Sequence, residues 1–433
     1  MKSSALFLGL VLSIVASLAM ACVAPTAPAP VVAHSVSFMI SGSQEEYKAY
    51  EALVKAFQAD TPGYTVDLRY MPDDAEYRRR LAADLSAGTQ PDLVLLNYRR
   101  VAPYADAGAF EPIGPYLEKS TTLKASDFYD TAMAAFVYQG QQWCLPQNVS
   151  SLVVYYNKSL FDAAGLAYPS AQWTWDDFLA TAKALTLDKD GDGVTDQYGV
   201  GMDPILYRLA PFIWQNGGEL IDDPARPTRL TLDTPEALAA FQWFVDLQVK
   251  EKVVPDAAAE EARDGQSRFL DGTLGMYFNS RRSTPTMRTI ESFDWDVAAL
   301  PRGKQAAGIL HTDAYCMTAG TKDKDAAWKF VEYANSVKGQ QLIAATGRTV
   351  PSLRAVAESP AFLDPRQKPA NSQVWLDIVP TLRAVPVMSN WPAIEDAASK
   401  EIERAFYGQA TVAEAAAAAA ELTQPIFDEV NQK

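Results

Sequence analysis

The chain has 433 residues and a net charge of −15, with 38 lysines and arginines against 53 aspartates and glutamates. A protein that binds nucleic acid needs a basic surface against the phosphate backbone, so this balance argues against a nucleic-acid partner. Once an N-terminal segment is set aside, about 400 residues remain, which is enough for two lobes with substantial cores.

The first 21 residues have the pattern of a secretory signal. Lys2 supplies the charged start, and residues 5–20 form an apolar run that is too short for a membrane span. The run ends beside Cys22, which resembles a bacterial lipoprotein cleavage site, although Ala19 replaces the leucine usual there. We expect residues 1–21 to be removed as a signal peptide and Cys22 to carry a lipid; a plain cleaved signal is the alternative.

Residues 22–34 form a Pro/Ala-rich segment that cannot pack a core and would stay extended as a tether. The folded part would then begin at Ser35. No later apolar run is long enough to span a bilayer, and the alanines at 415–420 belong to a predicted helix. These features predict an extracytoplasmic lipoprotein, anchored to the outer face of the cell membrane.

Strands and helices alternate at the start of the folded part. The apolar patterns predict strands at residues 35–40, 64–71 and 91–96, and helices at 43–59 and 74–87. This order is the doubly wound α/β pattern, in which ligands bind beyond the carboxyl ends of the strands. We therefore expect ligand contacts at residues 41–44 and 97–100. Later helices are predicted at residues 235–250, 324–335, 339–346, 394–406 and 411–430.

The most informative stretch begins at Leu152. An apolar strand ending in "YYNK" is followed by "LFDAAGL" and then by "TWDDF", where Thr174 can cap a helix with Asp177 three residues on. This order resembles the extracytoplasmic solute-binding proteins of ABC sugar importers (family 1), such as the maltose- and oligosaccharide-binding proteins. The segments "QNGGELID", "DGTLGMYFNS" and "TGRTVPSLRAV" carry the same resemblance.

The resemblance implies an α/β, two-lobed periplasmic-binding-protein-like fold of type II. Each lobe would be a sheet flanked by helices, with the ligand cleft between the lobes. Lobe one would hold residues 35–146 and 315–370, and lobe two residues 149–312 and 371–433. The implied function is a monomeric receptor that captures a carbohydrate, in particular an oligosaccharide, by lobe closure and delivers it to the permease subunits of an ABC importer.

An extracellular glycan-active enzyme is the alternative from another class. The chain has two histidines, His34 and His311, and it contains no nucleophile elbow, zinc-ligand spacing or phosphate loop. A glycosidase with two carboxylates is compatible with the composition, but no acidic pair stands out from the surface acids. We therefore predict no enzymatic activity and no cofactor for chemistry.

A candidate calcium loop lies at residues 188–197. Asp188, Asp190 and Asp192 occupy positions 1, 3 and 5 of a calcium-loop pattern, the Val194 carbonyl fits position 7, and Asp196 fits position 9. A glycine at position 12 departs from the pattern. Some members of the resembled family carry such a site as a structural clip, so we expect a structural Ca²⁺; an acidic surface turn is the alternative.

Cys144 and Cys316 remain as a pair if Cys22 carries the lipid. An extracytoplasmic location permits a disulfide between them, and two separate buried thiols are the alternative. In the resembled family the two segments are neighbouring crossovers between the lobes.

The resemblance also implies ligand-binding residues. The family places an aromatic residue that closes over the sugar just before the tail helix, which points to Trp391. A stacking aromatic is implied at Tyr207, whereas Trp214 is open between the core and the site. The implied contacts on cleft loops are Gln44, Asn97, Tyr98, Arg99, Asn148, Ser150, Asn279, Arg281 and Arg348.

Several of these loop residues are arginines. Arginine pairs hold carboxylates and phosphates in a bidentate manner, so a receptor for an anionic solute, such as a uronate saccharide or glycerol phosphate, is an alternative function. The more common fate of arginines is an ion pair with surface acids.

Overall fold

The computed structural model describes residues 33–431. The predicted signal peptide, Cys22 and nearly all of the tether lie outside these residues. Within the described part, no helix combines the length and the apolar character that crossing a membrane requires. The first strand begins at His34 rather than Ser35, because the His34 backbone N–H donates to Gly63 and its ring stacks on Tyr64.

The first of the two main sheets has six strands. Its order is β2-β1-β3-β13-β4, with β7 also paired to β13. The strands are β1 (His34–Ser41), β2 (Tyr64–Met71), β3 (Leu93–Asn97), β4 (Phe110–Glu111), β7 (Cys144–Pro146) and β13 (Asp313–Thr318). Strands β1, β2 and β3 are parallel, and β13 runs antiparallel to its neighbours.

Helices cover both faces of this sheet. Phe38 and Ile40 pack on one face and Met39 on the other, as the two-residue period of a strand requires. The helices packed here include α1 (Gln44–Asp60), α2 (Asp74–Ala87), α13 (Lys324–Ala334) and α14 (Val337–Ala345). The buried character of β3 predicted from its apolar sequence follows from this double cover.

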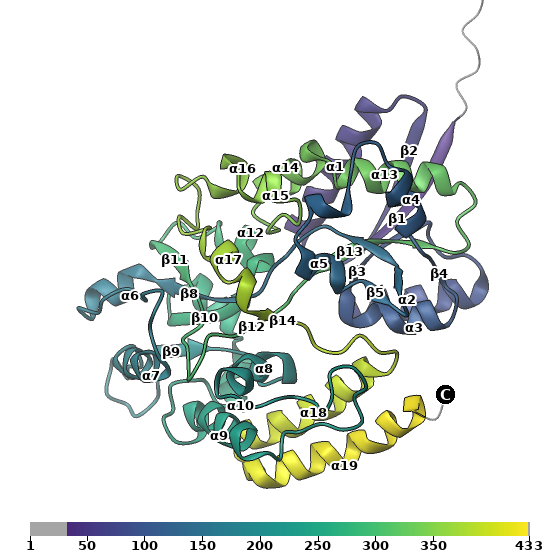
Figure 1. Ribbon diagram of the computed structural model, residues 1–433. Coiled ribbons are helices and arrows are strands. Elements are labelled where there is room, and N and C mark those ends of the chain that lie inside the picture. Colours follow the sequence, from purple (N-terminus) through teal and green to yellow (C-terminus); the bar gives the residue numbers. More distant parts are fainter. Residues whose placement is uncertain (1–32, 432–433) are drawn as a thin grey trace, which may run out of the picture.

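The second main sheet has four strands in the order β11-β8-β10-β9. The strands are β8 (Leu152–Asn157), β9 (Tyr198–Gly201), β10 (Leu274–Ser280) and β11 (Trp295–Ala298), and nearby helices include α7 (Trp175–Ala184), α8 (Leu206–Gln215), α9 (Pro235–Val249), α18 (Trp391–Phe406) and α19 (Val412–Asn431). Trp175, Phe212 and Trp243 form an aromatic cluster against this sheet. Figure 1 shows the two sheets in separate halves of the molecule, with α18 and α19 on the half of the second sheet.

Local sequence signals explain several element ends. Ser43 and Glu46 form a capping box at the start of α1, and Thr174 and Asp177 form another at α7, as the sequence indicates. Helix α2 ends at Gly88, whose positive φ of 70° suits glycine. Each of these caps satisfies backbone groups that a helix end leaves without intrahelical partners.

The segments that connect the two sheets run side by side. Ser150 and His311 exchange two backbone hydrogen bonds of 2.8 Å, and Val149 donates to Val350 at 2.9 Å. A disulfide between Cys144 and Cys316 joins β7 to β13 beside these connections, so of the two alternatives left by the sequence the structure has the bonded pair.

Candidate functional site

A cavity of about 790 Å³ lies between the two sheets, and most of the residues that line it are polar or charged. The lining residues come from loops after strands of both sheets and from the connections between them. They are Gly42, Ser43, Gln44, Glu46, Tyr70, Pro72, Asn97, Arg99, Asn148, Ser150, Tyr207, Arg208, Gln266, Asn279, Ser280, Arg282, Ser283, Thr286, His311, Asp313 and Arg348. The size falls in the range of about 300–1,000 Å³ that small-molecule pockets occupy.

The strand ends explain how these side chains meet. Strand β1 ends at Ser41, and Gly42, with a φ of 144°, turns the chain into α1. A side chain at position 42 would collide with the carboxylate of Glu46, so the close approach requires glycine. Strand β3 ends at Asn97 on the same edge, as the rule for ligand sites in doubly wound sheets predicts.

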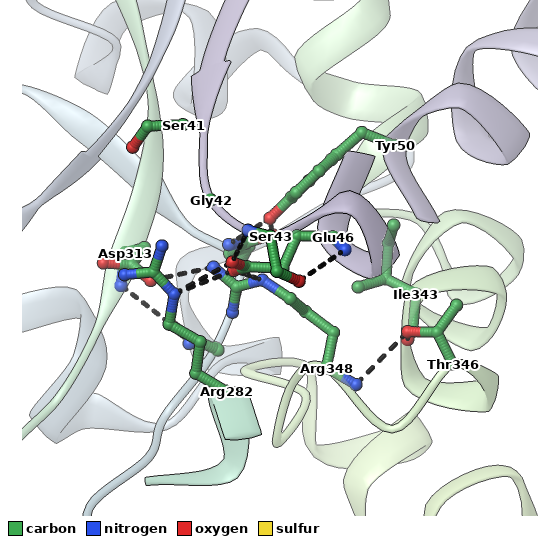
Figure 2. Close-up of polar contacts among 12 residues, drawn as sticks. Ser41, Gly42, Ser43, Glu46, Tyr50, Arg282, Asp313, Ile343, Thr346 and Arg348 are labelled. Carbon is green, nitrogen blue, oxygen red and sulfur yellow. Dashed lines mark hydrogen bonds and ion pairs between the residues drawn. The ribbon is translucent and has the colours of Figure 1, made fainter. Parts of the chain in front are cut away.

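Glu46 is the centre of a charge cluster in the cavity wall. Its carboxylate accepts the Ser43 backbone N–H at 2.7 Å and the Arg282 Nε at 2.9 and 3.1 Å, and the Arg348 Nε lies 2.5 Å away. Figure 2 shows both guanidinium groups reaching this carboxylate. Glu46 is 2% exposed, and the two arginines supply the charge that such burial requires.

A second ion pair lies at the cavity edge. Arg99 Nη1 donates to both carboxylate oxygens of Glu395 at 2.7 and 2.8 Å, which joins the loop after β3 to helix α18. The Arg99 guanidinium lies 4.5 Å from the centre of the Tyr207 ring, and that of Arg208 lies 5.2 Å from it. The Tyr207 ring is therefore held between polar groups of both halves of the molecule.

His311 lies beside these arginines. Burial, and after it the positive charges of Arg99, Arg208 and Arg282, hold the pKa of His311 well below its usual range. The imidazole is therefore neutral at physiological pH, and it can offer one ring nitrogen as a donor and the other as an acceptor.

The cavity brings together most of the ligand-binding residues that the sequence implied. Those in its wall are Gln44, Asn97, Arg99, Asn148, Ser150, Tyr207, Asn279 and Arg348. They come from six separate parts of the chain, and they lie near the end of a strand, near the end of a helix or in a connection between the sheets.

Four of the predicted ligand contacts do not line the cavity, so their assignment to its wall is wrong. They are Tyr98, Trp214, Arg281 and Trp391. Tyr98 is fully buried, and its hydroxyl accepts the Val385 N–H in the core. Arg281 is buried between the Phe362 and Trp375 rings. Their chain neighbours face the cavity instead.

The two tryptophans are also core residues. Trp214 is 2% exposed in the hydrophobic core around α8. Trp391 is fully buried at the start of α18, which begins three residues earlier than predicted because Pro392 fits the first turn of a helix. The Trp391 indole N–H donates to Glu395 at 3.3 Å. Glu395 in turn accepts from Arg99, which lines the cavity, so Trp391 is connected to the cavity wall only through this carboxylate.

Several wall residues escaped the sequence analysis. The most important are Glu46, Arg208, Arg282, His311 and Asp313. Arg208 and Arg282 each follow a predicted contact by one residue, and Glu46 carries the capping-box signal of α1. His311 had a signal as well, because it is one of two histidines in the chain.

The acidic loop at residues 188–197 lies apart from the cavity. Carboxylate oxygens of Asp188, Asp190 and Asp196 come within 4.8 Å of one another. Asp188 accepts the N–H groups of Gly191 and Gly193, which curls the loop around these oxygens. An all-oxygen donor set of this kind fits a hard cation such as Ca²⁺. Asp192 instead accepts the backbone N–H of Val194.

The two-lobed α/β fold and the polar cavity between its sheets define a solute-binding protein. Residues 41–341 match the family of bacterial extracellular solute-binding proteins, and the chain belongs to this family.

Among curated relatives, the chain is 26% identical to the maltotriose-binding protein of Pyrococcus abyssi (strain GE5 / Orsay), over 66% of this chain and 59% of the relative. It also resembles the ABC substrate-binding protein Lmo0181 of Listeria monocytogenes, solved in complex with cycloalternan (24% identity, TM-score 0.83, 91% and 99% of the two chains). A further structural relative is the GacH receptor of Streptomyces glaucescens (22% identity, TM-score 0.79, 92% and 99%). These structural likenesses show the fold.

Proposed function

We propose that this protein is the substrate-binding component of an ABC importer and that it captures a carbohydrate in the cavity between its lobes. The observation that carries the proposal is the polar cavity of about 790 Å³, whose wall is contributed by both halves of the molecule. A solute that contacts both walls stabilises the closed arrangement over an open one. The volume leaves room for an oligosaccharide of a few units.

The chemistry of the wall supports a polyhydroxylated ligand. Planar amides at Gln44, Asn97 and Asn279 can donate to and accept from hydroxyl groups. Tyr70 and Tyr207 add aromatic surface to the wall, against which the apolar C–H groups of a sugar can pack. The relatives named for maltotriose and solved with cycloalternan agree with this solute class.

The test is a calorimetric titration with neutral sugars from monosaccharides to trisaccharides and with short polyols. We expect saturable binding of one ligand per protein, and at least about tenfold weaker binding by Tyr207→Ala because the ring contact is lost. Tyr168→Ala removes an exposed tyrosine outside the cavity and is the matched control. Equal affinities of Tyr207→Ala and the unaltered protein would place the ligand elsewhere.

The same proposal states that the protein binds the sugar without altering it chemically. The bound sugar, recovered after prolonged incubation and analysed by chromatography, should be unchanged. Release of a shortened or modified sugar would instead favour the glycan-active enzyme.

We also propose that the mature protein is anchored through a lipid on Cys22 and delivers its solute to membrane permease subunits. The secretory pattern of residues 1–21 and the family membership support this location. In a bacterial host, Cys22→Ala should move the protein from the membrane fraction to the soluble extracytoplasmic fraction. Retention of Cys22→Ala in the membrane would contradict the anchor.

The acidic loop is proposed as a structural Ca²⁺ site. Bound Ca²⁺ would join three separated carboxylates, so it should raise the thermal unfolding midpoint, and a chelator should lower it. Asp188→Asn should abolish this response. The matched control is Asp130→Asn, which removes a carboxylate that is 93% exposed and lies outside the loop. An unchanged midpoint with and without Ca²⁺ would show the loop to be a simple acidic turn.

A further inference from the structure

Apart from Arg348 Nε, which lies 2.5 Å from the Glu46 carboxylate, three buried polar atoms in the cavity wall have no hydrogen-bond partner among residues 33–431. They are Ser150 Oγ, Arg208 Nη1 and His311 Nε2. Ser150 and Arg208 are 3% and 6% exposed. A buried polar group without a partner costs free energy, so three of them in one cavity wall indicate the place of a polar ligand group.

The three side chains belong to one region of the wall. Ser150 and His311 face each other across a two-residue antiparallel bridge, which places their side chains next to each other. The His311 ring lies 5.7 Å from the Tyr207 ring, and the Arg208 guanidinium lies 5.2 Å from that same ring. The three side chains thus belong to the part of the wall around Tyr207.

The two carboxylates in the cavity wall, those of Glu46 and Asp313, are already engaged. Glu46 accepts from Ser43 and Arg282 and lies against Arg348. Asp313 accepts from Asn97 at 3.0 Å. A hydroxyl group needs an acceptor for its proton as well as a donor for its oxygen, whereas an ionised carboxylate or phosphate needs donors only. The surplus of donors therefore favours an anionic oxygen group.

The charge of Arg208 also favours an anionic group at this place. The carboxylate paired with Arg208 is that of Asp203, 3.0 Å away, and the Asp203 side chain is 51% exposed. Because water screens an exposed carboxylate, it leaves much of the Arg208 charge available to a buried ligand.

We propose that Ser150, Arg208 and His311 form a subsite for an anionic oxygen group, a carboxylate or a phosphate, on the captured solute. Arg208 Nη1 and the Ser150 hydroxyl donate to the anion, and His311 donates from Nε2 in its neutral form. The inference rests on the proposed function, since it specifies the class of solute that the same cavity takes. The preferred solute is then an acidic sugar or a sugar or polyol phosphate.

The experiment compares acidic and neutral partners by calorimetry. The pairs are galacturonate with galactose, glucuronate with glucose, and glycerol 3-phosphate with glycerol; inorganic phosphate alone is a further titrant. We expect the acidic member of at least one pair to bind roughly 10- to 100-fold more tightly, as charge-assisted hydrogen bonds to a buried anion predict. The uronate and phosphate pairs distinguish the two sources of the anion.

Variants connect this preference to the subsite. Arg208→Gln should remove most of the preference for the acidic member while changing the affinity for neutral sugars by much less. Ser150→Ala, which keeps every charge, should reduce the preference in the same direction. Arg366→Gln removes an arginine that is 88% exposed and should leave both affinities unchanged. Circular dichroism checks the folding of each variant. If Arg208→Gln does not fold, the effect of Ser150→Ala on the preference for the acidic member decides the test.

Two outcomes would overturn the subsite. The first is equal affinity within every pair when neutral sugars bind, which leaves the carbohydrate-binding proposal intact. The second is an equal loss of acidic and neutral affinity in Arg208→Gln and Ser150→Ala. If no sugar, polyol or anion of either class binds, the proposed function fails together with the subsite.

Discussion

Glu46 serves both the start of a helix and the wall of the cavity. Its side chain accepts the Ser43 N–H in the capping box of α1, and it also receives Arg282 and Arg348. A capping-box glutamate is usually a surface residue, and here burial and two guanidinium groups convert it into a fixed acceptor. The cavity wall therefore presents arginine side chains at this point rather than a free carboxylate.

The neutral state of His311 makes a prediction for the pH dependence of stability. Because the folded pKa lies below the unfolded value of about 6.5, the unfolded chain binds a proton that the folded protein does not. The free energy of unfolding should thus fall by about 1 kcal/mol between pH 7 and pH 5.5, and His311→Asn should remove this part of the fall. Urea unfolding at several pH values measures it.

His34→Asn, at the other histidine, is the control and should keep the fall that His311 causes. An identical pH profile for His311→Asn and the unaltered protein would contradict the assignment.

At the scale of single residues, the sequence predicted which segments form the site more accurately than which side chains of those segments face the cavity. Tyr98 and Arg281 were assigned to the cavity, but their neighbours Asn97, Arg99 and Arg282 line it. Each of these segments enters a short 3₁₀ helix after a strand, and that turn decides which of two adjacent side chains faces the ligand. The pairing of Arg99 with Glu395 joins residues 296 positions apart, which no local pattern indicates.

At the scale of elements, the disulfide joins strands that are 172 residues apart in the sequence. A crosslink that closes so long a loop restricts the unfolded chain strongly. Replacing both Cys144 and Cys316 by alanine should lower the free energy of unfolding by about 2–5 kcal/mol. Denaturant unfolding under non-reducing conditions measures this loss, and a reductant should destabilise the unaltered protein but not the double variant.

The elements themselves follow from local signals to different degrees. Helices α2 and α7 and strand β2 could be predicted from caps and periodicity, because their apolar faces and end residues are encoded within the segment. Two-residue strands such as β4 and β14 (Leu382–Arg383) could not, since they exist only through pairing with β13 and with β12 (Gly308–Ile309). Their stability lies in tertiary contacts rather than in local sequence.

At the scale of the whole molecule, two ion pairs bridge the halves. Glu46 on α1 pairs with Arg282 after β10, and Arg99 after β3 pairs with Glu395 on α18. Each charge-assisted hydrogen bond contributes roughly 1.5–3 kcal/mol, so we expect these pairs to favour the present arrangement of the halves over a more open one.

The double variant Glu46→Gln, Glu395→Gln should shift the ligand-free protein towards an open form by about tenfold or more. Small-angle X-ray scattering should then show a larger radius of gyration than that of the unaltered protein. Glu219→Gln breaks an exposed pair with Arg383 on the half of the second sheet and is the control. An unchanged radius in the double variant would show that these pairs do not hold the halves together.

The hydrogen-bonded connections between the sheets have a mechanical consequence. Because adjacent segments are tied by backbone bonds at Ser150–His311 and Val149–Val350, we expect any movement of the halves to follow a leaf hinge, which bends about one axis and resists twisting. The relative movement of the halves is then reduced to a single coordinate. One pair of fluorescent dyes, with one dye on each half, should therefore report the occupancy of the protein as a single distance, which would make this receptor a scaffold for an optical sensor of its own solute.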